Sequence, residues 1–345
     1  MAGIFKPRHL FLVSRLQERG IAFNLEEGLT QSYNPLRAAL TAYFTVGELG
    51  ALTYVVHGNT GQEQVEGFVQ MRERRTRPEA DVLFMSPALS DDVDSEVWHH
   101  LLTYVCQQAG ERGIERLFAR LPEGGEEVQR FSHVGFSVYT REDVFCLGEG
   151  NRVKTDPLSD VGIRPSRAED VIAVYQLYTA VTSRLVQQAE NVSGKERLCP
   201  PDVWPVTGDR QGYVLEKDDQ ILGCLTVRLG RIGHWLYVLL HPRAYDHADD
   251  LLAYGLATLH DVPSRPVYCG VREYQGGLRA VLEDMGFQRF VSQTLMVKHT
   301  TVRVIDPVRA LRPALDKRAE ATTPTVSPVN GHRARPAVQN RSTES

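Results

Sequence analysis

The sequence has few cysteines, no long apolar run and little excess charge, and each shortage argues against a class of protein. Its five cysteines are widely spaced and form no C-x-x-C pair, so we expect neither a disulfide framework nor a metal site. The apolar run at residues 10–13 is too short for a secretory segment or a membrane span. We therefore expect a cytoplasmic protein with no membrane partner.

The charge and size of the chain narrow the choice further. A formal net charge of −4 at pH 7 supplies no field to hold a polyanion, so we expect no nucleic-acid partner. A hydrophobic content of 42% is enough to build a packed core. At 345 residues, the chain is long enough for two domains and a short remainder.

Composition places the boundaries between these parts. Residues 305–345 are rich in Pro, Ser and Thr and lack apolar periodicity, which predicts a disordered tail. Gly, Asn, Asp and Pro gather around residues 151–160, which predicts a linker. The sequence thus predicts one domain at 1–150 and a second at 161–304.

The two halves repeat one order of elements. Each is expected to contain a hairpin, a short apolar strand followed by Pro, an amphipathic helix, another strand, a short helix ending at Gly-Phe, and a final β-rich run. The matching segments are 52–74 and 212–230, 82–85 and 235–240, 114–121 and 266–271, and Gly135-Phe136 and Gly286-Phe287. Repetition at this long period indicates a duplicated architecture.

This order resembles the GNAT superfamily of acyl-CoA N-acyltransferases, in two divergent tandem copies. Leu240-His241-Pro242 is similar to the family's V-x-P at the end of its central strand, and Met285-Gly286-Phe287 to its G-F before the last strand. The resemblance implies a mixed α/β (α+β) fold of two GNAT-like domains, each a mostly antiparallel mixed sheet flanked by helices. It also implies acyl transfer from acetyl-CoA, or another acyl-CoA, to a small-molecule or peptide amine.

The second copy keeps the pattern better, and the resemblance places the acyl-CoA site there. In the family, loop amides at a helix N-terminus hold the CoA pyrophosphate. The positions carried over are Leu239, Leu240, Tyr245, Asp246, His247, Ala248 and Asp249. The first copy is expected to be degenerate and to complete the substrate groove.

Both copies depart from the family at the phosphate loop. The loops at 88–96 and 243–250 contain no glycine and carry several carboxylates, which cap helix N-termini well but repel a pyrophosphate. Phe131 and Leu282 stand where many members have a tyrosine acid. A non-catalytic GNAT-fold binding or scaffold protein therefore remains the alternative function.

A general base for an amine acceptor is sought near the second central strand. The candidates are His241 at the end of this strand and His234 before it, with Tyr237 in the middle; His57 and Asp81 are weaker. The alternative for either strand-end histidine is a hydrogen bond to the backbone. The basic run at 72–77 is interpreted as a solvated face.

The tandem copies also predict how the chain is assembled. We expect them to pack on each other as the subunits of a homodimer do, which would make the chain a monomeric pseudo-dimer. Crossed-over or separated halves would contradict that packing. An acyl-CoA enzyme further requires a V-shaped gap between its two central parallel strands, so closed gaps in both copies would contradict the enzyme hypothesis.

Overall fold

The computed structural model describes residues 2–60, 63–74, 77–89, 95–149, 162–190 and 208–300. The expected linker at 151–160 and the expected tail at 305–345 lie outside these residues. Residues Met1–Val302 group into one compact unit, so the contacts between Cα atoms do not separate the two halves from each other.

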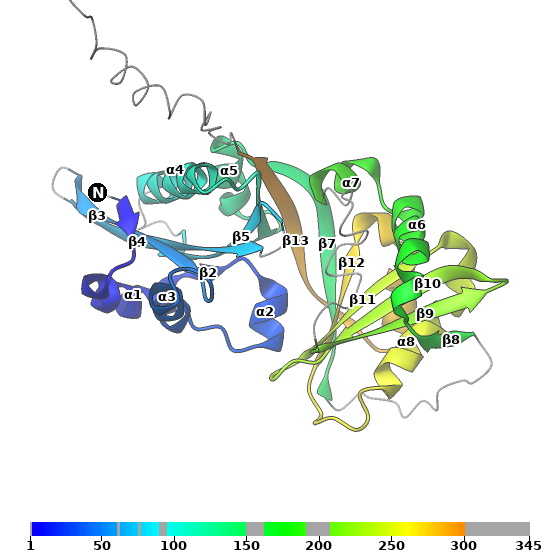
Figure 1. Cartoon of the computed structure of the whole chain (residues 1–345). Coiled ribbons are helices and arrows are strands. Elements are labelled where there is room, and N and C mark those ends of the chain that lie inside the picture. The colour runs from blue at the N-terminus through cyan, green and yellow to red at the C-terminus, as the bar shows by residue number, and fades with distance from the viewer. Residues whose placement is uncertain are drawn as a thin grey trace, which may run out of the picture. The chain divides into compact units, whose positions relative to one another are not determined.

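The first half follows the expected element order and adds short elements at its start (Figure 1). Its elements are β1 (Ala2–Ile4), η1 (Pro7–His9), α1 (Leu10–Leu16), η2 (Gln17–Arg19), β2 (Ile21–Ala22), α2 (Leu25–Thr30), α3 (Pro35–Phe44), β3 (Leu52–Thr60), β4 (Glu63–Arg74), β5 (Glu79–Ser86), α4 (Ser95–Glu111), β6 (Arg116–Pro122), α5 (Glu126–His133) and β7 (Ser137–Leu147).

The second half repeats the same plan from its own first strand onward. Its elements are β8 (Ile163–Pro165), η4 (Ala168–Asp170), α6 (Val171–Val181), α7 (Arg184–Glu190), β9 (Arg210–Lys217), β10 (Gln220–Arg228), β11 (His234–Leu240), η5 (Pro242–His247), α8 (Ala248–Ala257), β12 (Val267–Arg272), η6 (Glu273–Gln275), α9 (Gly277–Asp284) and β13 (Gln288–His299).

The two Gly-Phe pairs end equivalent helices in the same way. Gly135 and Gly286 have φ angles of 91° and 86°, the left-handed conformation that glycine adopts most easily after a helix. The following Phe136 and Phe287 are buried, and their amides donate to the carbonyls of Phe131 and Leu282. The motif repeats because it both stops the helix and anchors the next strand.

The strands form one continuous sheet across both halves, in the order β1-β3-β4-β5-β6-β13-β7-β12-β11-β10-β9-β8, with β2 beside β5. Only β5–β6 and β11–β12 are parallel among the described pairs. The final strands are exchanged: β13 of the second half pairs with β6 of the first, and β7 of the first pairs with β12 of the second. The two strands also pair with each other in the middle.

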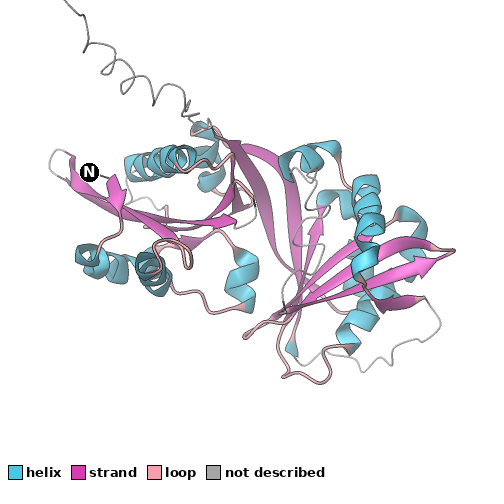
Figure 2. Ribbon diagram, viewed as in Figure 1, coloured by secondary structure: helices cyan, strands magenta, loops and turns pink. Residues whose placement is uncertain are grey.

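This exchange differs from the expected packing of two closed copies. Each half of the sheet is completed by the last strand of the other half, so the halves are crossed over rather than placed side by side. The mixed α/β fold with flanking helices is confirmed (Figure 2). The crossed-over halves contradict the expected pseudo-dimer packing of the two copies.

Helices cover both faces of each half. In the first half, α4 and α5 bury Trp98 and Phe131 on one face, and α1 and α3 bury Val13 and Ala39 on the other. In the second half, α8 and α9 cover one face, and α6 buries Tyr178 on the opposite face. Every flanking helix thus contributes an apolar stripe to a core against the sheet.

Two helices pack on strands of the opposite half. Leu25 and Leu29 of α2 pack with Trp235 of β11, and Val186 of α7 packs with Phe118 of β6. The crossing of the final strands is therefore accompanied by a crossing of helices, which brings side chains of each half to the central strands of the other. Among the described helices, none has both the length and the hydropathy needed to cross a membrane.

The strand exchange predicts a specific cross-link. Ala119 of β6 lies directly opposite Met296 of β13, so cysteines at both positions should form a disulfide after air oxidation. Val271→Cys with Met296→Cys is the control, because Val271 would lie near Met296 only if β13 stayed with its own half. Peptide mapping by mass spectrometry measures both. A cross-link in the control pair and none in the Ala119 pair would contradict the exchange.

Candidate functional site

Both parallel strand pairs separate part-way along their length. In the second half, β11 and β12 pair from His234 opposite Val267 to Tyr237 opposite Gly270, and both strands then continue unpaired with each other. In the first half, the pairing of β5 with β6 ends at Asp81 opposite Phe118. Neither pair is closed along its whole length, so the geometry required of an acyl-CoA enzyme is not contradicted.

The gap of the first half is filled by its own chain. Strand β2 pairs with β5 through Ile21 opposite Met85 and Ala22 opposite Phe84. Because β4 occupies the other edge of β5, β2 must lie on the edge that faces the gap. A Cβ at Gly20 would stand 2.6 Å from the Met85 carbonyl oxygen, so only glycine permits this approach. No sequence pattern predicts this strand, because it is only two residues long.

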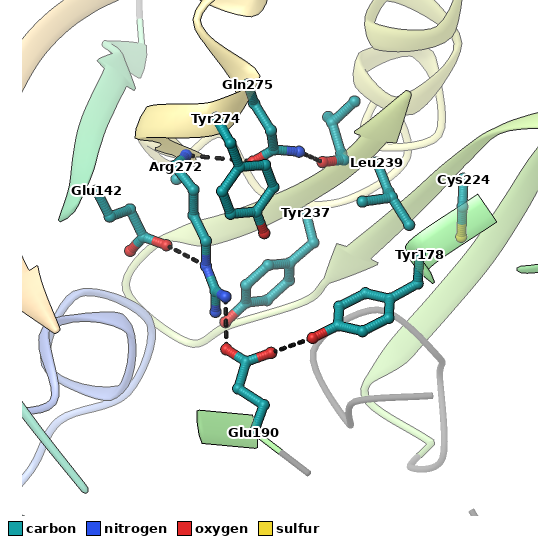
Figure 3. Close-up of a pocket in the computed structure, with 11 residues that line it drawn as sticks. Glu142, Tyr178, Glu190, Cys224, Tyr237, Leu239, Arg272, Tyr274 and Gln275 are labelled. Carbon is teal, nitrogen blue, oxygen red and sulfur yellow. Dashed lines mark hydrogen bonds and ion pairs between the residues drawn. The ribbon is translucent and has the colours of Figure 1, made fainter. Parts of the chain in front are cut away.

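The gap of the second half opens into a pocket (Figure 3). Strands β10, β11 and β12 supply one side of it, and α6, α7, η6 and the exchanged strand β7 supply the rest. Its lining residues are Glu142, Tyr178, Glu190, Cys224, Tyr237, Val238, Leu239, Gly270, Arg272, Tyr274 and Gln275. One residue that lines this second-half pocket, Glu142 of β7, therefore comes from the first half of the sequence.

Gln275 spans the mouth of this gap. Its Nε2 donates to the Val238 carbonyl oxygen at 2.6 Å, and its Oε1 accepts from the Arg272 amide at 3.2 Å. The Val238 carbonyl therefore faces the gap, and the backbone edge of β11 beyond Tyr237 has a side-chain partner where a paired strand is absent. The Gln275 amide therefore connects β11 to β12 where the two strands are separated.

A charged group lies at the centre of the pocket. Glu190, the last residue of α7, is 8% exposed and accepts from the Tyr178 hydroxyl at 2.8 Å and from Arg272 Nη1 at 2.5 Å. Arg272 Nε lies 3.5 Å from Glu142, which also accepts from Gln293. The pocket thus holds two carboxylates and one guanidinium, an arrangement that favours a cationic ligand.

Burial and neighbouring charges fix the protonation of the two partners of Glu190. Burial raises the pKa of Tyr178 far above its usual range, and the Glu190 carboxylate raises it further, so the phenol remains a donor. Burial by itself lowers the pKa of Arg272, but Glu190 and its other neighbours raise it well above the usual value. Burial also raises the pKa of Tyr274, whose ring points into the pocket in Figure 3.

The three predicted catalytic residues lie in different places. Tyr237 lines the pocket, and its hydroxyl donates to Glu26 of α2. His234 is buried at the paired end of β11, where its Nδ1 accepts from the Gly230 amide, and it does not line the gap. His241 caps η5, because its Nδ1 accepts from the Arg243 amide at 3.2 Å. Both histidines therefore accept a hydrogen bond from a backbone amide, which the sequence left open as the alternative to a catalytic role.

The predicted phosphate loop is the turn η5 and the start of α8. Leu239 lines the gap, whereas Leu240 and Ala248 are buried in the second core. Tyr245 packs over Gly277, and Asp246 and Asp249 are exposed. The positions of these residues are compatible with a ligand at the helix N-terminus, but their contact with a pyrophosphate stays a prediction.

Internal contacts already engage part of this loop. The Ala244 amide donates to the His241 carbonyl, and the Ala248 amide to the Tyr245 carbonyl. His247 lies 3.3 Å from Asp250 and 3.5 Å from Lys217, which brings one cation of the β9–β10 hairpin to the start of α8. The loop therefore combines a helix N-terminus and a lysine, which favour an anion, with acidic residues that oppose it.

Sequence reasoning missed most of the pocket. No short sequence motif marks its charged residues and Tyr178. They come from four elements spread over the chain: Glu142, Tyr178, Glu190 and Arg272. The repeat could have indicated Arg272, because Arg272 and Arg120 occupy equivalent positions in the two copies. Each lies two residues beyond the last parallel pair of its strand. Within the described residues, no group of three His, Cys, Asp or Glu side chains is placed to hold a metal ion.

Comparison with known proteins found similar chains among solved structures. No family model and no curated protein matches the chain. Among solved structures, a GCN5-related N-acetyltransferase from Sphaerobacter thermophilus is 15% identical, covers 87% of this chain and 95% of its own, and has a TM-score of 0.49. A tandem GNAT protein from the clavulanic acid biosynthesis pathway is 15% identical with a TM-score of 0.47, over 87% of this chain and 98% of its own.

The topology defines the class of fold. Two copies of one element order, each with a separated parallel strand pair beside an amphipathic helix, form the duplicated mixed α/β fold that the sequence predicted. Both copies are divergent at the loop that follows the central strand.

The capping role of His241 is testable. His241→Ala should lower the free energy of unfolding by about 0.5–2 kcal/mol, because the first turn of η5 loses its side-chain acceptor. His241→Asn should restore most of that loss, since its amide oxygen accepts the same bond. Urea unfolding measures both variants. Unchanged stability of His241→Ala would contradict the capping role.

Proposed function

We propose that the protein transfers an acyl group from acetyl-CoA, or another acyl-CoA, to the amine of a small molecule or peptide. The reaction is assigned to the second copy. The observation that carries this is the contrast between the two gaps: β2 occupies the first, whereas the second opens into a pocket with a buried carboxylate. We further propose that the chain acts as a monomer in the cytoplasm, where the four described cysteines stay reduced.

The second gap suits an extended acyl-CoA arm. The backbone edge of β11 from Val238 onward lacks a strand partner on the β12 side, and the Val238 carbonyl faces the gap. At the far end, Lys217 and the N-terminus of α8 lie near His247 and offer positive charge to phosphates. The carboxylates Asp249 and Asp250 oppose phosphate binding, so we expect modest affinity.

The pocket side chains divide the proton transfers between them. An acceptor amine is attracted by the two carboxylates, and Glu190 takes its proton as the nitrogen attacks the acyl carbonyl. The new C–N bond forms as the C–S bond breaks, and the departing thiolate needs one proton. Tyr274 is assigned as the proton donor because its phenol faces the pocket and its raised pKa keeps the hydroxyl protonated before the reaction. Tyr178 and Arg272 orient Glu190.

The alternative is a GNAT-fold binding protein without CoA chemistry. The observation that favours it is the loop itself, which lacks glycine, carries acids and already uses amides in internal hydrogen bonds. Under this alternative, the pocket binds a cationic ligand without transferring a group. Binding of acetyl-CoA decides between the two.

Isothermal titration of the full chain with acetyl-CoA, and with CoA as a control, should show one site per chain. A second site is not expected, because β2 fills the first gap. Asp249→Asn should tighten binding about two- to fivefold by removing one repelling charge at the start of α8, whereas Asp261→Asn after this helix should not. Two sites would contradict the closure of the first gap. No binding would favour the non-catalytic alternative.

The role of Glu190 is tested by Glu190→Gln in a thiol-release assay with a panel of amines. We expect kcat to fall about 10²- to 10⁴-fold with acetyl-CoA affinity unchanged, because the amide cannot accept the proton. Glu169→Gln, an exposed carboxylate of η4, is the matched control. Undiminished turnover in Glu190→Gln would remove this residue from the mechanism.

A further inference from the structure

The first half of the chain supplies a buried carboxylate to the edge of the second gap. Glu26 of α2 is 4% exposed, and its Oε2 accepts from the hydroxyl of Tyr237, which lines the gap pocket. Its Oε1 accepts from Arg228 Nη1 at 2.6 Å and from Arg210 Nη2 at 3.3 Å, both in the second half. A charged carboxylate is a stronger acceptor than a neutral group, so it holds the Tyr237 hydroxyl firmly.

Helix α2 places this carboxylate precisely, because contacts of two kinds attach the helix to β11 and its turn. Two leucines of α2 pack with Trp235 of β11, as described above. The carbonyl of Thr30, the last residue of α2, accepts from the Arg231 amide at 2.7 Å in the turn between β10 and β11. Glu26 therefore has a fixed position relative to Tyr237.

A second side chain of the first half reaches the same pocket. Arg77 donates from Nη1 to the backbone carbonyl of Glu190 at 2.9 Å. Its side chain is 11% exposed, so the interpretation of 72–77 as a solvated face is wrong for this residue. Arg77 and Glu26 also line a second cavity, of about 270 Å³, whose lining residues come from both halves. The first copy thus contacts two residues that line the gap pocket of the second copy.

Tyr237 stands where the parallel strands of the second half separate. It is the last residue of β11 that pairs with β12, opposite Gly270, and the gap begins at the next residue. Its ring lies 6.0 Å from the Trp235 ring and 5.7 Å from the Arg210 guanidinium, measured from the ring centroid. With the hydrogen bond to Glu26, these contacts fix the ring as one wall of the pocket (Figure 3).

The pocket that this ring bounds is narrow. Its volume is about 30 Å³, which leaves room for about two groups the size of a water molecule. Two further tyrosine rings line it, those of Tyr178 and Tyr274. A Cβ at Gly270 would stand 3.0 Å from the Glu142 carboxyl carbon, so this side has no spare room either. An amino group on an unbranched carbon fits such a space, whereas a branch at that carbon would press against the rings.

We propose that Tyr237 limits the size of the amine that the gap pocket accepts, and that Glu26 of the first copy positions Tyr237 for this role. The class of ligand is a primary amine on an unbranched carbon. This inference rests on the amine site of the proposed function, and it holds whether the amine is acylated there or only bound. The first copy thus acts on the selectivity of the second copy through a hydrogen bond.

Selectivity is measured with n-butylamine and tert-butylamine, which have the same composition and charge and differ only in branching. The full chain is titrated calorimetrically with each amine, alone and with saturating CoA. We expect the unbranched isomer to bind about tenfold tighter or more, because a methyl group that a pocket cannot accommodate costs about that factor. Tyr237→Leu, which removes the ring, should abolish most of this difference.

The positioning role of Glu26 is tested by a double-mutant cycle. Tyr237→Phe keeps the ring, removes the hydroxyl and leaves Glu26 bound to its two arginines. We expect it to lower the ratio of the two affinities about threefold, the effect of one lost hydrogen bond. Glu26→Gln should lower the ratio in the unmodified chain and leave it unchanged in the Tyr237→Phe background, because both substitutions act on the same bond.

Two matched controls accompany the cycle. Glu27→Gln changes the adjacent carboxylate of α2, which binds Arg72 of the first half, and Tyr254→Phe removes a tyrosine hydroxyl from α8. Neither residue lines the gap pocket, so both variants should keep the selectivity of the unmodified chain. The ratio also separates selectivity from stability, because partial unfolding would weaken the binding of both isomers equally.

The proposal is overturned if the two isomers bind equally to the unmodified chain, or if neither binds at about 50 mM. It is also overturned if Tyr237→Phe leaves the ratio unchanged, or if Glu26→Gln lowers the ratio equally in both backgrounds. The last result would mean that Glu26 does not act through the Tyr237 hydroxyl.

A kinetic arm separates this inference from the proposed acyl transfer. In the thiol-release assay, the ratio of kcat/KM for the two amines should follow the ratio of affinities in every variant. If no amine is acylated while the affinities behave as expected, the proposed function fails and this inference stands. If both isomers are acylated with equal kcat/KM, this inference fails and the proposed function stands.

Discussion

The exchange of β7 and β13 between the halves is the constraint on which the other features depend. Because each last strand completes the opposite half of the sheet, neither core is closed without the other half. Glu142 reaches the second gap only because β7 lies beside β12. The helices α2 and α7 pack on the opposite central strands for the same topological reason, and they bring Glu26 and Glu190 to the region between the copies.

The two copies differ in what occupies the gap between their parallel strands. Both retain a separated parallel strand pair, which indicates a common plan. In the first copy, Gly20 allows β2 to approach and occupy the edge of β5 that a ligand backbone would need. In the second copy, a side chain rather than a strand spans the opening, since Gln275 satisfies the Val238 carbonyl. A side chain moves more easily than a paired strand, so the second gap is the one that can open to a ligand.

The pocket of the second gap and the neighbouring cavity between the two halves are lined by different charged residues. The gap pocket is lined by two carboxylates and one arginine, whereas the neighbouring cavity is lined by six arginines and three carboxylates. Glu26 and Tyr237 meet at the boundary, so Tyr237, a catalytic candidate from the sequence, connects the two regions.

The sequence by itself determined the order of elements, the two hairpins, the Gly-Phe helix ends and the divergent loops. These depend on local rules: apolar periodicity, turn residues and the freedom of glycine at positive φ. Only the tertiary structure decided the strand exchange, the filling of the first gap by β2 and the group around Glu190. The physical reason is that strand pairing and buried ion pairs join residues far apart in the chain, and neither the partner strand nor the partner charge is encoded by spacing along the sequence.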